Sequence, residues 1–363
     1  MDSMKTITLI LALGLLNISN SFAKTWYAEP IAVGLNIPWG LSYLGGNRVI
    51  VSEKNGTIGI LNLETGRYKD IATAPNVSVS GQGGLLDIAV SPLDSNQIYV
   101  TYSKAVDGNI ETTLARASIQ GEQLSQWRDL LVTKSGSDGG RHFGSRITFD
   151  ANHLYFSVGD RGIRDNGQDL TTHSGSILRV TLDGKPAQDN PFIGQRDHQQ
   201  EIWSFGHRNP QGLYFDSELS QLWSIEHGPR GGDEVNLIKK GANYGWPITS
   251  HGKEYWGPIS VGEATEKDGI VSPQKVYIPS IAPSSLILYR GERHPTLNGK
   301  LLAGALKLTH INVLTLQETK IVKEERILED LRERIRDIEA LPDGNILFST
   351  DSGKIYRLVN TKQ

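Results

Sequence analysis

Hydrophobic and polar positions alternate in short runs along this chain, and the same order of runs recurs over most of its length. A polar turn rich in Gly, Asp or Asn is followed by a short β-rich run, a second polar turn and another β-rich run. Six copies of this pattern are spaced roughly 40 to 70 residues apart. The copies lie at residues 39–63, 87–119, 146–182, 211–238, 284–316 and 337–359.

Repeats of about 40 to 50 residues that each hold several strands are typical of a β-propeller. A single such sheet has two apolar faces, and packing against neighbouring sheets in a ring removes both from water. The pattern therefore predicts an all-β protein, a six-bladed β-propeller, with a β-sandwich or two stacked sheets as the alternative. Residues 26–35 (WYAEPIAVGL) precede the first full repeat. We expect them to complete the last blade and close the ring.

One segment, residues 318–337 (ETKIVKEERILEDLRERIRD), departs from this pattern. Its Glu and Arg residues recur at helical spacing, which locally predicts a charged helix with i,i+4 ion pairs over the first half. The end of the segment, RERIRD, leads directly into the sixth repeat. We expect it at the inner end of a blade.

The first 23 residues have the pattern of an export signal. Lys5 supplies a positive start, ITLILALGLLNI supplies an apolar run, and Ser21-Phe22-Ala23 supplies a small-x-small cleavage site. No later segment approaches the roughly 20 apolar residues of a transmembrane helix. A short membrane anchor or a buried strand is the alternative reading of the apolar run. We expect a signal peptide over residues 1–23 and a propeller domain over residues 24–363, without a membrane span.

The composition of the chain excludes several kinds of partner and of active site. The formal net charge of -3 produces no field that would attract nucleic acid or an anionic membrane. The chain contains no Cys, which excludes thiol nucleophiles, zinc–thiolate sites and iron–sulfur clusters. A chain of this length buries a core large enough to need no disulfides. The chemistry must therefore come from oxygen, nitrogen or a cofactor.

Polar groups gather between short predicted strands in residues 201–247. The loop GHRNPQG places His207, Arg208 and Asn209 between glycines, EHGPRGGDE adds carboxylates and backbone bends, and ANYGWP closes the stretch. Loops at strand ends usually carry function. Each loop alone could be an ordinary polar turn, but three in one stretch favour a functional site.

Other loops have the same character. They are SGQGGLLDIA with Gln82, GGRHFGSRI with His142, SVGDRG with Asp160, ALKLTH with Lys307, and RIRD with Arg334 and Arg336, which face one side of an extended segment. In a propeller the starts of the inner strands converge on the central channel, so these residues would surround one polar funnel. Singly, each could be a capped turn, a satisfied histidine or an exposed cation.

The motifs IPWGL, GQGGLLDIA, RHFGSR, SVGDRG, FGHRNPQG, EHGPRGGDEVN, NYGWP and RIRD occur in that order over nearly the whole expected mature chain. In this combination the sequence resembles the soluble quinoprotein glucose/aldose sugar dehydrogenases, and in particular their periplasmic aldose dehydrogenase branch. The resemblance implies a six-bladed propeller with pyrroloquinoline quinone (PQQ) across the top of the central channel. It also implies oxidation of aldoses at the anomeric hydroxyl and transfer of the electrons to an external acceptor.

The resemblance further implies residue roles. His142 would be the general base, Asp160 would orient its imidazole, and Arg208 would lie near the quinone oxygen that gains charge. The implied cofactor contacts are Gln82, Arg208, Asn209, Tyr255, Lys307, Arg334 and Arg336. The implied calcium ligands are the carbonyls of Gly228 and Pro229 at a site shared with PQQ, and Glu234 and Tyr244 at a second, structural site. Arg forks suit the three carboxylates of PQQ, and calcium prefers oxygen ligands.

One departure from the resemblance concerns the sugar. The glucose-preferring branch has an acid directly before the base, whereas this chain has Arg141, which favours a broad aldose specificity. Two alternatives to the dehydrogenase stay open. One is a calcium-dependent six-bladed lactonase or hydrolase, which would not need the cations at Lys307, Arg334 and Arg336. The other is a non-catalytic propeller that binds a partner or glycan on its rim.

Overall fold

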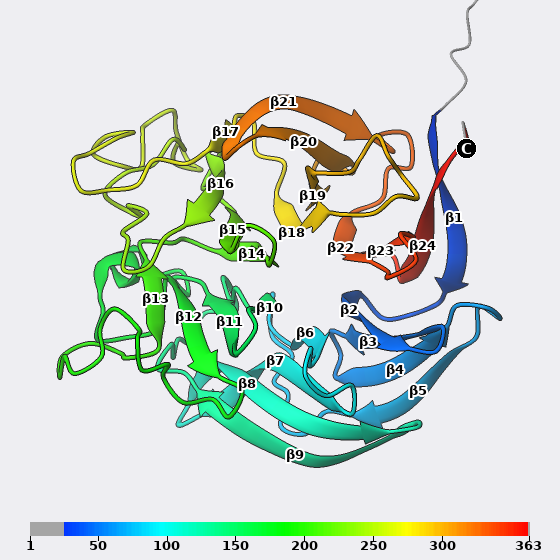
Figure 1. Ribbon diagram of the computed structural model, residues 1–363. Coiled ribbons are helices and arrows are strands. Elements are labelled where there is room, and N and C mark those ends of the chain that lie inside the picture. Colours follow the sequence, from blue (N-terminus) through cyan, green and yellow to red (C-terminus); the bar gives the residue numbers. More distant parts are fainter. Residues whose placement is uncertain (1–24, 362–363) are drawn as a thin grey trace, which may run out of the picture.

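The computed structural model of the protein describes residues 25–361, which form six four-stranded antiparallel sheets arranged as blades around a central axis (Figure 1). The predicted six-bladed β-propeller is confirmed. The predicted signal peptide, residues 1–23, lies outside the described residues. From the first blade to the sixth, the strands are β2 (Pro38–Gly45), β3 (Arg48–Glu53), β4 (Thr57–Asn62) and β5 (Tyr68–Thr73); β6 (Leu85–Val90), β7 (Gln97–Val106), β8 (Asn109–Gln120) and β9 (Gln123–Val132); β10 (Ile147–Phe149), β11 (His153–Val158), β12 (Ser176–Thr181) and β13 (Ile202–Phe205); β14 (Pro210–Asp216), β15 (Gln221–Glu226), β16 (Asp233–Ile238) and β17 (Lys275–Tyr277); β18 (Pro283–Tyr289), β19 (Lys300–Ala305), β20 (Ile311–Gln317) and β21 (Lys320–Ile327); and β22 (Ile335–Ala340), β23 (Ile346–Thr350), β24 (Lys354–Asn360) and β1 (Trp26–Val33).

Each of the six sequence repeats holds the first three strands of one blade, counted outward from the axis. The ring is closed as expected, because β1 at the start of the chain pairs with β24 at its end. Trp26 pairs with Asn360, and Val33 pairs with Lys354 (Figure 1). The two ends of the described chain therefore share one sheet, and opening the ring requires breaking that pairing.

The apolar core lies between the blades. Six clusters of buried side chains fill the six contacts between neighbouring sheets. Between the first and second blades, for example, Ile50 and Ile58 pack with Leu85 and Val100, and all four side chains are fully buried. Burying a side chain of this size stabilises the fold by about 1.5–3 kcal/mol. The apolar runs of the repeats thus form the contacts between neighbouring blades, as the repeat pattern predicted.

The charged helix predicted in the first half of 318–337 is wrong. The segment forms strand β21, which pairs with β20 from Gln317↔Lys320 to Ile311↔Ile327. Its charges are paired sideways rather than along a helix, since Glu324 lies 2.7 Å from Lys275 Nζ. Leu328 and Arg332 follow with left-handed backbones (φ 65° and 54°), which no helix tolerates. Tertiary pairing with the outer edge of the fifth blade outweighs local helical spacing.

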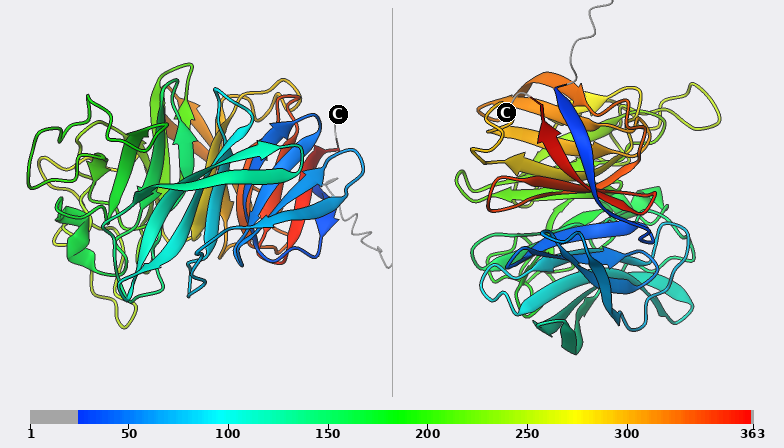
Figure 2. Two further views of the ribbon diagram at one scale, coloured as in Figure 1. Left: turned by 90° about the horizontal axis from the view of Figure 1, so that it is seen from below. Right: turned by 90° about the vertical axis from the view of Figure 1, so that its right-hand side faces the viewer.

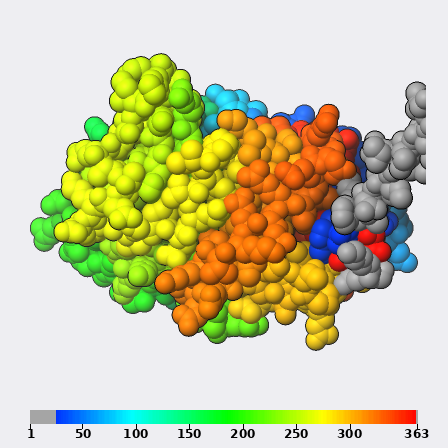
Figure 3. Space-filling view, turned by 90° about the horizontal axis from the view of Figure 1, so that it is seen from above, coloured from blue at the N-terminus to red at the C-terminus, as the bar shows by residue number. Residues whose placement is uncertain are grey.

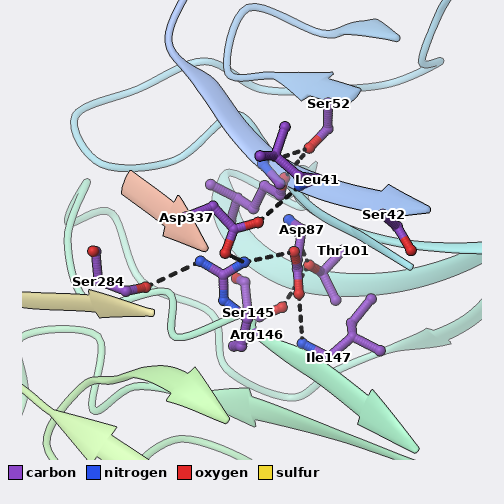
Figure 4. Close-up of polar contacts among 12 residues, drawn as sticks. Leu41, Ser42, Ser52, Asp87, Thr101, Ser145, Arg146, Ile147, Ser284 and Asp337 are labelled. Atoms are coloured by element: carbon purple, nitrogen blue, oxygen red, sulfur yellow. Dashed lines mark hydrogen bonds and ion pairs between the residues drawn. The ribbon is translucent and has the colours of Figure 1, made fainter. Parts of the chain in front are cut away.

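A buried arginine ties the blades together at the axis. Arg146, just before β10, places Nη1 2.8 Å from both Asp87 Oδ1 and Asp337 Oδ1 (Figure 4). Its Nε donates to the Gln211 carbonyl (3.1 Å) and its Nη2 to the Ser284 carbonyl (3.0 Å). One side chain therefore joins the second, third, fourth, fifth and sixth blades. We call these residues the central Arg146 cluster.

The longest departure from a regular blade is the segment 239–274 between β16 and β17. It runs along the third blade, where Asn243 pairs with Phe205, and its loops project from one end of the disc in yellow-green (Figures 2 and 3). A short 3-10 helix, η1 (Arg164–Gln168), lies between β11 and β12. No helix within residues 25–361 is long and apolar enough to cross a membrane.

Candidate active site

A cavity of about 290 Å³ opens at one end of the central channel. Loops from all six blades contribute to its wall, as expected for residues that converge on a propeller axis. Its polar wall residues include Lys54, Gln82, Asn209, Arg334 and Arg336. Apolar side chains cover the remaining wall, chiefly Trp39, Leu86, Phe143 and Leu306. We call this space the central cavity. A smaller cavity beside it is lined by His142, Asp160, Arg164, Arg208 and Tyr255.

His142 and Asp160 form a buried pair. His142 Nδ1 lies 2.6 Å from Asp160 Oδ1. The carboxylate can only accept here, so Nδ1 carries the proton and Nε2 keeps its lone pair. Nε2 has no hydrogen-bond partner among residues 25–361. The expectation that Asp160 orients the imidazole of His142 thus agrees with the distance between them.

Asp160 is itself held by several donors. Its Oδ1 also accepts from the Gly162 amide (2.7 Å), and its Oδ2 accepts from the Trp246 indole (2.8 Å). Its own amide donates to the Arg208 carbonyl at 2.8 Å. A carboxylate bonded by several donors in this way is fixed in direction. Trp246, which lies in the NYGWP motif, therefore belongs to the site, although its role was not predicted.

Burial lowers the pKa of His142 below its ordinary value. The hydrogen bond to Asp160 opposes this shift, and the charges of Arg208 and Arg141 add to it. The imidazole is therefore neutral near pH 7, which is the state that a general base requires.

The loop that carries His142 is held from the second blade. The His142 amide donates to Gln82 Oε1 at 2.8 Å, and the Gln82 amide donates to the Gly140 carbonyl at 2.7 Å. Only glycine fits at position 81, because its φ is 57° and a Cβ there would lie 2.2 Å from the Gly140 carbonyl oxygen. From the other side, Asn209 Oδ1 accepts from the Gly144 amide at 3.1 Å.

Arg208 is 8% exposed and lines both the smaller cavity beside His142 and the small space that holds the metal candidates. Its amide donates to Glu226 Oε2 at 2.7 Å, and its guanidinium stacks 5.3 Å from the Trp246 ring. Its Nη1 donates to the carbonyls of Gly228 (2.8 Å) and His227 (3.2 Å). A fixed cation thus lies between the imidazole and the predicted calcium ligands.

Arg334 and Arg336 flank the buried Ile335 and face the same side, as their spacing predicted. Both bond one carboxylate, since Asp351 lies 2.7 Å from Arg334 Nε and 2.7 Å from Arg336 Nε. Burial raises the pKa of Asp351, but Arg336 and Arg334 outweigh it and hold that pKa below its usual range. Asp351 therefore offsets one of the two cations. The second arginine keeps its positive charge, and Lys54 adds another to the cavity wall. Lys54 Nζ donates to the Gly81 carbonyl at 2.5 Å.

Two predicted contacts lie further out. Lys307 is exposed, and its neighbour Leu306, rather than Lys307 itself, lines the central cavity. Tyr255 is 66% exposed and lines the smaller cavity beside His142. It sits on the projecting 239–274 segment, next to Glu254, which forms a two-pronged pair with Arg164 (2.8 Å for each prong).

The predicted metal ligands surround a third, very small space of about 10 Å³, which is room for one ion or water. Gly228, Pro229, Glu234 and Tyr244 all line it, together with Glu226. The described residues contain no cluster of three or more His, Cys, Asp or Glu side chains spaced for a metal. A cation here would depend on carbonyls and on the two glutamates.

The donor set fits calcium. Burial and, after it, the charge of the nearby Glu226 together raise the pKa of Glu234 to about 8, so a cation beside the two carboxylates would be stabilising. The Tyr244 hydroxyl is engaged elsewhere, because it donates to the Leu237 carbonyl at 2.6 Å. Only the backbone carbonyl of Tyr244 is left for an ion. Gly228 must be glycine, since a Cβ would lie 2.1 Å from the Gly232 carbonyl oxygen.

Sequence reasoning missed Lys54, Asp351, Glu226 and His227. Lys54 and Asp351 lie in short turns just after β3 and β23, where their spacing carries no signal. Glu226 and His227 lie inside the EHGPRGGDE motif but were given no role. His227 is partly buried with its Nε2 2.5 Å from the Pro283 carbonyl, and desolvation, with the charge of Arg208, lowers its pKa to about 3. It is therefore a neutral donor that holds the cavity wall.

Comparisons with known proteins agree with this geometry. A family model described as Glucose / Sorbosone dehydrogenase matches residues 35–357. The aldose sugar dehydrogenase YliI of Escherichia coli (strain K12) is 34% identical over 351 residues, covering 92% of this chain and 94% of that protein. The apo crystal structure of soluble aldose sugar dehydrogenase from Escherichia coli has a TM-score of 0.88 at 32% identity, covering 93% of this chain and 100% of that one. The PQQ-bound aldose sugar dehydrogenase from Streptomyces coelicolor has a TM-score of 0.76 at 28% identity, covering 92% and 97%.

Proposed function

Because the chain belongs to the glucose/sorbosone dehydrogenase family, we propose that it oxidises aldose sugars at the anomeric C1 hydroxyl to the lactone, with PQQ and calcium as cofactors. The observation that carries the proposal is the His142–Asp160 pair, which leaves a neutral Nε2 next to a cavity lined by cations. The export pattern of residues 1–23 supports a periplasmic location.

In the proposed reaction His142 Nε2 takes the proton of the anomeric hydroxyl, while Asp160 stabilises the imidazolium that forms. When bound, PQQ supplies the two-electron acceptor for the hydride of C1, and an external acceptor then removes the electrons. Arg208, fixed in the wall of the smaller cavity with His142, would stabilise developing negative charge.

The residues that would hold the cofactors follow from the cavities. Gln82, Asn209, Arg334 and Arg336 line the space into which a flat tricarboxylate would fit. Tyr255 in the smaller cavity, and Lys307 beside the wall residue Leu306, would reach the same ligand from further out. Arg336 Nη1 and Arg334 Nη2 have no hydrogen-bond partner among residues 25–361, so each guanidinium keeps donors for a carboxylate. The carbonyls of Gly228 and Pro229 would hold a calcium ion beside Arg208, where a Lewis acid is useful. The resemblance assigned Glu234 and Tyr244 to a second ion, but all four residues line one small space, so we propose that they serve the same calcium ion.

A dye-reduction assay tests the proposal. The purified protein is treated with chelator and assayed with several aldoses, with PQQ alone, calcium alone, both or neither. We expect dye reduction only with both, activity on several aldoses rather than glucose alone, and the lactone or its hydrolysed acid as the product. Deuterium at C1 should slow the reaction, because the C1–H bond breaks.

The same assay distinguishes the alternatives. A calcium-dependent lactonase would hydrolyse lactones with calcium alone and reduce no dye. A binding module would show neither activity, and substitution of His142 would then leave all measured properties unchanged. Either result would overturn the proposed function.

A further inference from the structure

The side chain of Arg161 lies buried beneath the loop that carries His142. It is 1% exposed, and all of its protein hydrogen bonds go to backbone carbonyls. Nη1 donates to the Arg141 carbonyl, and Nη2 donates to the carbonyls of Gly139 (3.1 Å) and Ile110 (3.2 Å). Two of these three carbonyls belong to the His142 loop itself.

The flat face of the guanidinium has a second contact. Its central carbon lies 3.5 Å from the centroid of the Phe143 ring, within the range of a cation–π interaction. Arg161 therefore contacts the residue before His142 through a hydrogen bond and the residue after it through stacking. No other side chain of the site touches both neighbours of this histidine in these ways.

Charge makes this placement unusual. No carboxylate of residues 25–361 forms an ion pair with Arg161, and its Nε lacks a hydrogen-bond partner. Burial lowers the pKa of Arg161 to about 10, while Glu111 and Asp160 oppose the shift at longer range. Burying a charge without a counter-ion is costly. An apolar side chain would fill the same volume at lower cost, so packing alone does not explain an arginine here.

The backbone supplies the reason for a rigid anchor. His142 is left-handed (φ 56°), Ser145 also has a positive φ (88°), and Arg161 itself is left-handed (φ 59°). Such conformations are strained and persist only when the surroundings fix them. Gln82 and Asn209 accept hydrogen bonds from amides of the loop, and Arg161 donates to its carbonyls. The loop is thus fixed at its amide groups and at its carbonyl groups.

We propose that Arg161 is a positioning residue for the base, because its buried guanidinium fixes the carbonyl of Arg141 and the ring of Phe143 and so sets the backbone of His142. The inference rests on the proposed function of His142 as base. Asp160 and Arg161 then divide one task between adjacent residues. The carboxylate of Asp160 orients the imidazole, and the guanidinium of Arg161 orients the chain from which that imidazole projects. A lysine cannot replace it, because one ammonium cannot span the separate carbonyls in the plane of a fork.

The test uses Arg161→Lys and Arg161→Gln in the full chain, with Arg179→Lys as the matched control. Arg179 is also buried (7% exposed) and also lies in the third blade. Its guanidinium pairs with Asp189 at 2.6 Å and makes no contact with His142 or its loop. Melting temperature, PQQ affinity, kcat and KM are measured for each variant. We expect both Arg161 variants to lose 10-fold or more in kcat, with PQQ affinity and sugar KM changed less than about threefold. Arg179→Lys should affect melting without a comparable loss in kcat.

A second readout does not depend on activity. The proton on His142 Nδ1, shared with Asp160, is followed by NMR in the cofactor-free protein, and it is assigned by its absence in His142→Ala. We expect the Arg161 variants to shift or broaden this resonance and to change the titration midpoint of His142, and Arg179→Lys to leave both unchanged. If the Arg161 variants melt lower but keep the resonance, the midpoint and kcat, Arg161 is only structural and the proposal is wrong. If no variant oxidises sugars but the resonance still responds, the proposed function fails while the positioning stands.

Discussion

The surroundings of His142 give this residue the features that its proposed role as a base requires. The imidazole is buried, bonded on one side to Asp160 and open on the other, while its main chain is held by Gln82. Burial lowers the pKa of His142, with Arg208 adding and Asp160 opposing. The neutral form, which accepts the proton, therefore persists to a lower pH than for a free histidine.

This geometry predicts the pH dependence of sugar oxidation. Protonation inactivates a base, so kcat/KM should fall as the pH drops through the pKa of His142, and the midpoint should lie below the ordinary value of 6.5. His142→Ala should lose about 10²–10⁴ in kcat, the usual contribution of general base catalysis, and should still bind PQQ. Steady-state rates between pH 4.5 and 8 measure both effects.

The control is His198→Ala, because His198 stacks on Phe192 outside the candidate cavities. It should keep the rate and the midpoint of the wild type. Near-normal turnover in His142→Ala, or an acid limb centred above 6.5, would remove His142 from the role of base.

At the residue scale the sequence identified several chemical groups and one pairing, His142 with Asp160, but not the partners of the cavity arginines. His142, Asp160 and Arg208 could be named because they lie in Gly-rich loops and in motifs that resemble a known family. Asp351 could not, because it lies in a short turn after β23 and becomes relevant only when the sixth blade places it 2.7 Å from both Arg334 and Arg336. Long-range pairing of this kind leaves no local pattern.

Strands differ in how visible they are in the sequence. Most of the inner strands are largely buried, as in β3 and β23, and apolar runs predicted them. The outer strands β5, β9 and β21 are partly exposed and mixed in polarity. Their patterns carry little information, and for β21 the charges indicated a helix instead. An edge strand is determined by the strand with which it pairs, and a short stretch of the sequence does not contain that partner.

The start of β22 makes a prediction about cofactor binding. Arg334 and Arg336 both line the central cavity, whereas Lys307 is exposed beside it. Losing one charged hydrogen bond costs about 1.5–3 kcal/mol. Arg336→Ala and Arg334→Ala should each weaken PQQ binding by about that amount, and Lys307→Ala should weaken it by less. Titration of the cofactor-free protein with PQQ measures the three affinities.

A matched control is Arg326→Ala. Arg326 lies on β21, the outer strand of the fifth blade, where it pairs with Glu324. It does not line the central cavity. Its affinity for PQQ should equal that of the wild type. Unchanged affinity in both Arg334→Ala and Arg336→Ala would show that these arginines do not hold the cofactor.

The whole molecule is a ring whose blades are joined at three radii. At the rim β1 closes the sixth blade, in the interior six apolar clusters fill the contacts between blades, and at the axis Arg146 bonds groups from four other blades (Figure 4). Six repeats and a leading strand were enough to predict the first two features. The axial cluster was not predicted, because Arg146 is one arginine in an ordinary-looking RITF run.

The candidate sites lie where loops of separate blades meet, which links cofactor binding to stability. Calcium held by Gly228, Pro229 and Glu234 would bind the folded ring and not the unfolded chain. A ligand of that kind stabilises by about 2.7 kcal/mol at a hundred times its dissociation constant. Chelator-treated protein should therefore melt higher when calcium is added, and higher again when PQQ follows.

The variant Glu234→Gln tests the metal part of this prediction. It keeps the shape of the side chain but removes a hard, charged ligand, and carboxylates are ligands that calcium prefers. It also relieves the repulsion between the partly buried Glu234 and the buried Glu226, so without calcium it should melt no lower than the wild type. Adding calcium should then raise its melting temperature by clearly less than in the wild type. Glu64→Gln, at the exposed turn between β4 and β5, should respond to calcium like the wild type. Equal calcium responses in all three proteins would mean that Glu234 binds no calcium, and a melting temperature indifferent to both calcium and PQQ would contradict the cofactor assignment of this propeller.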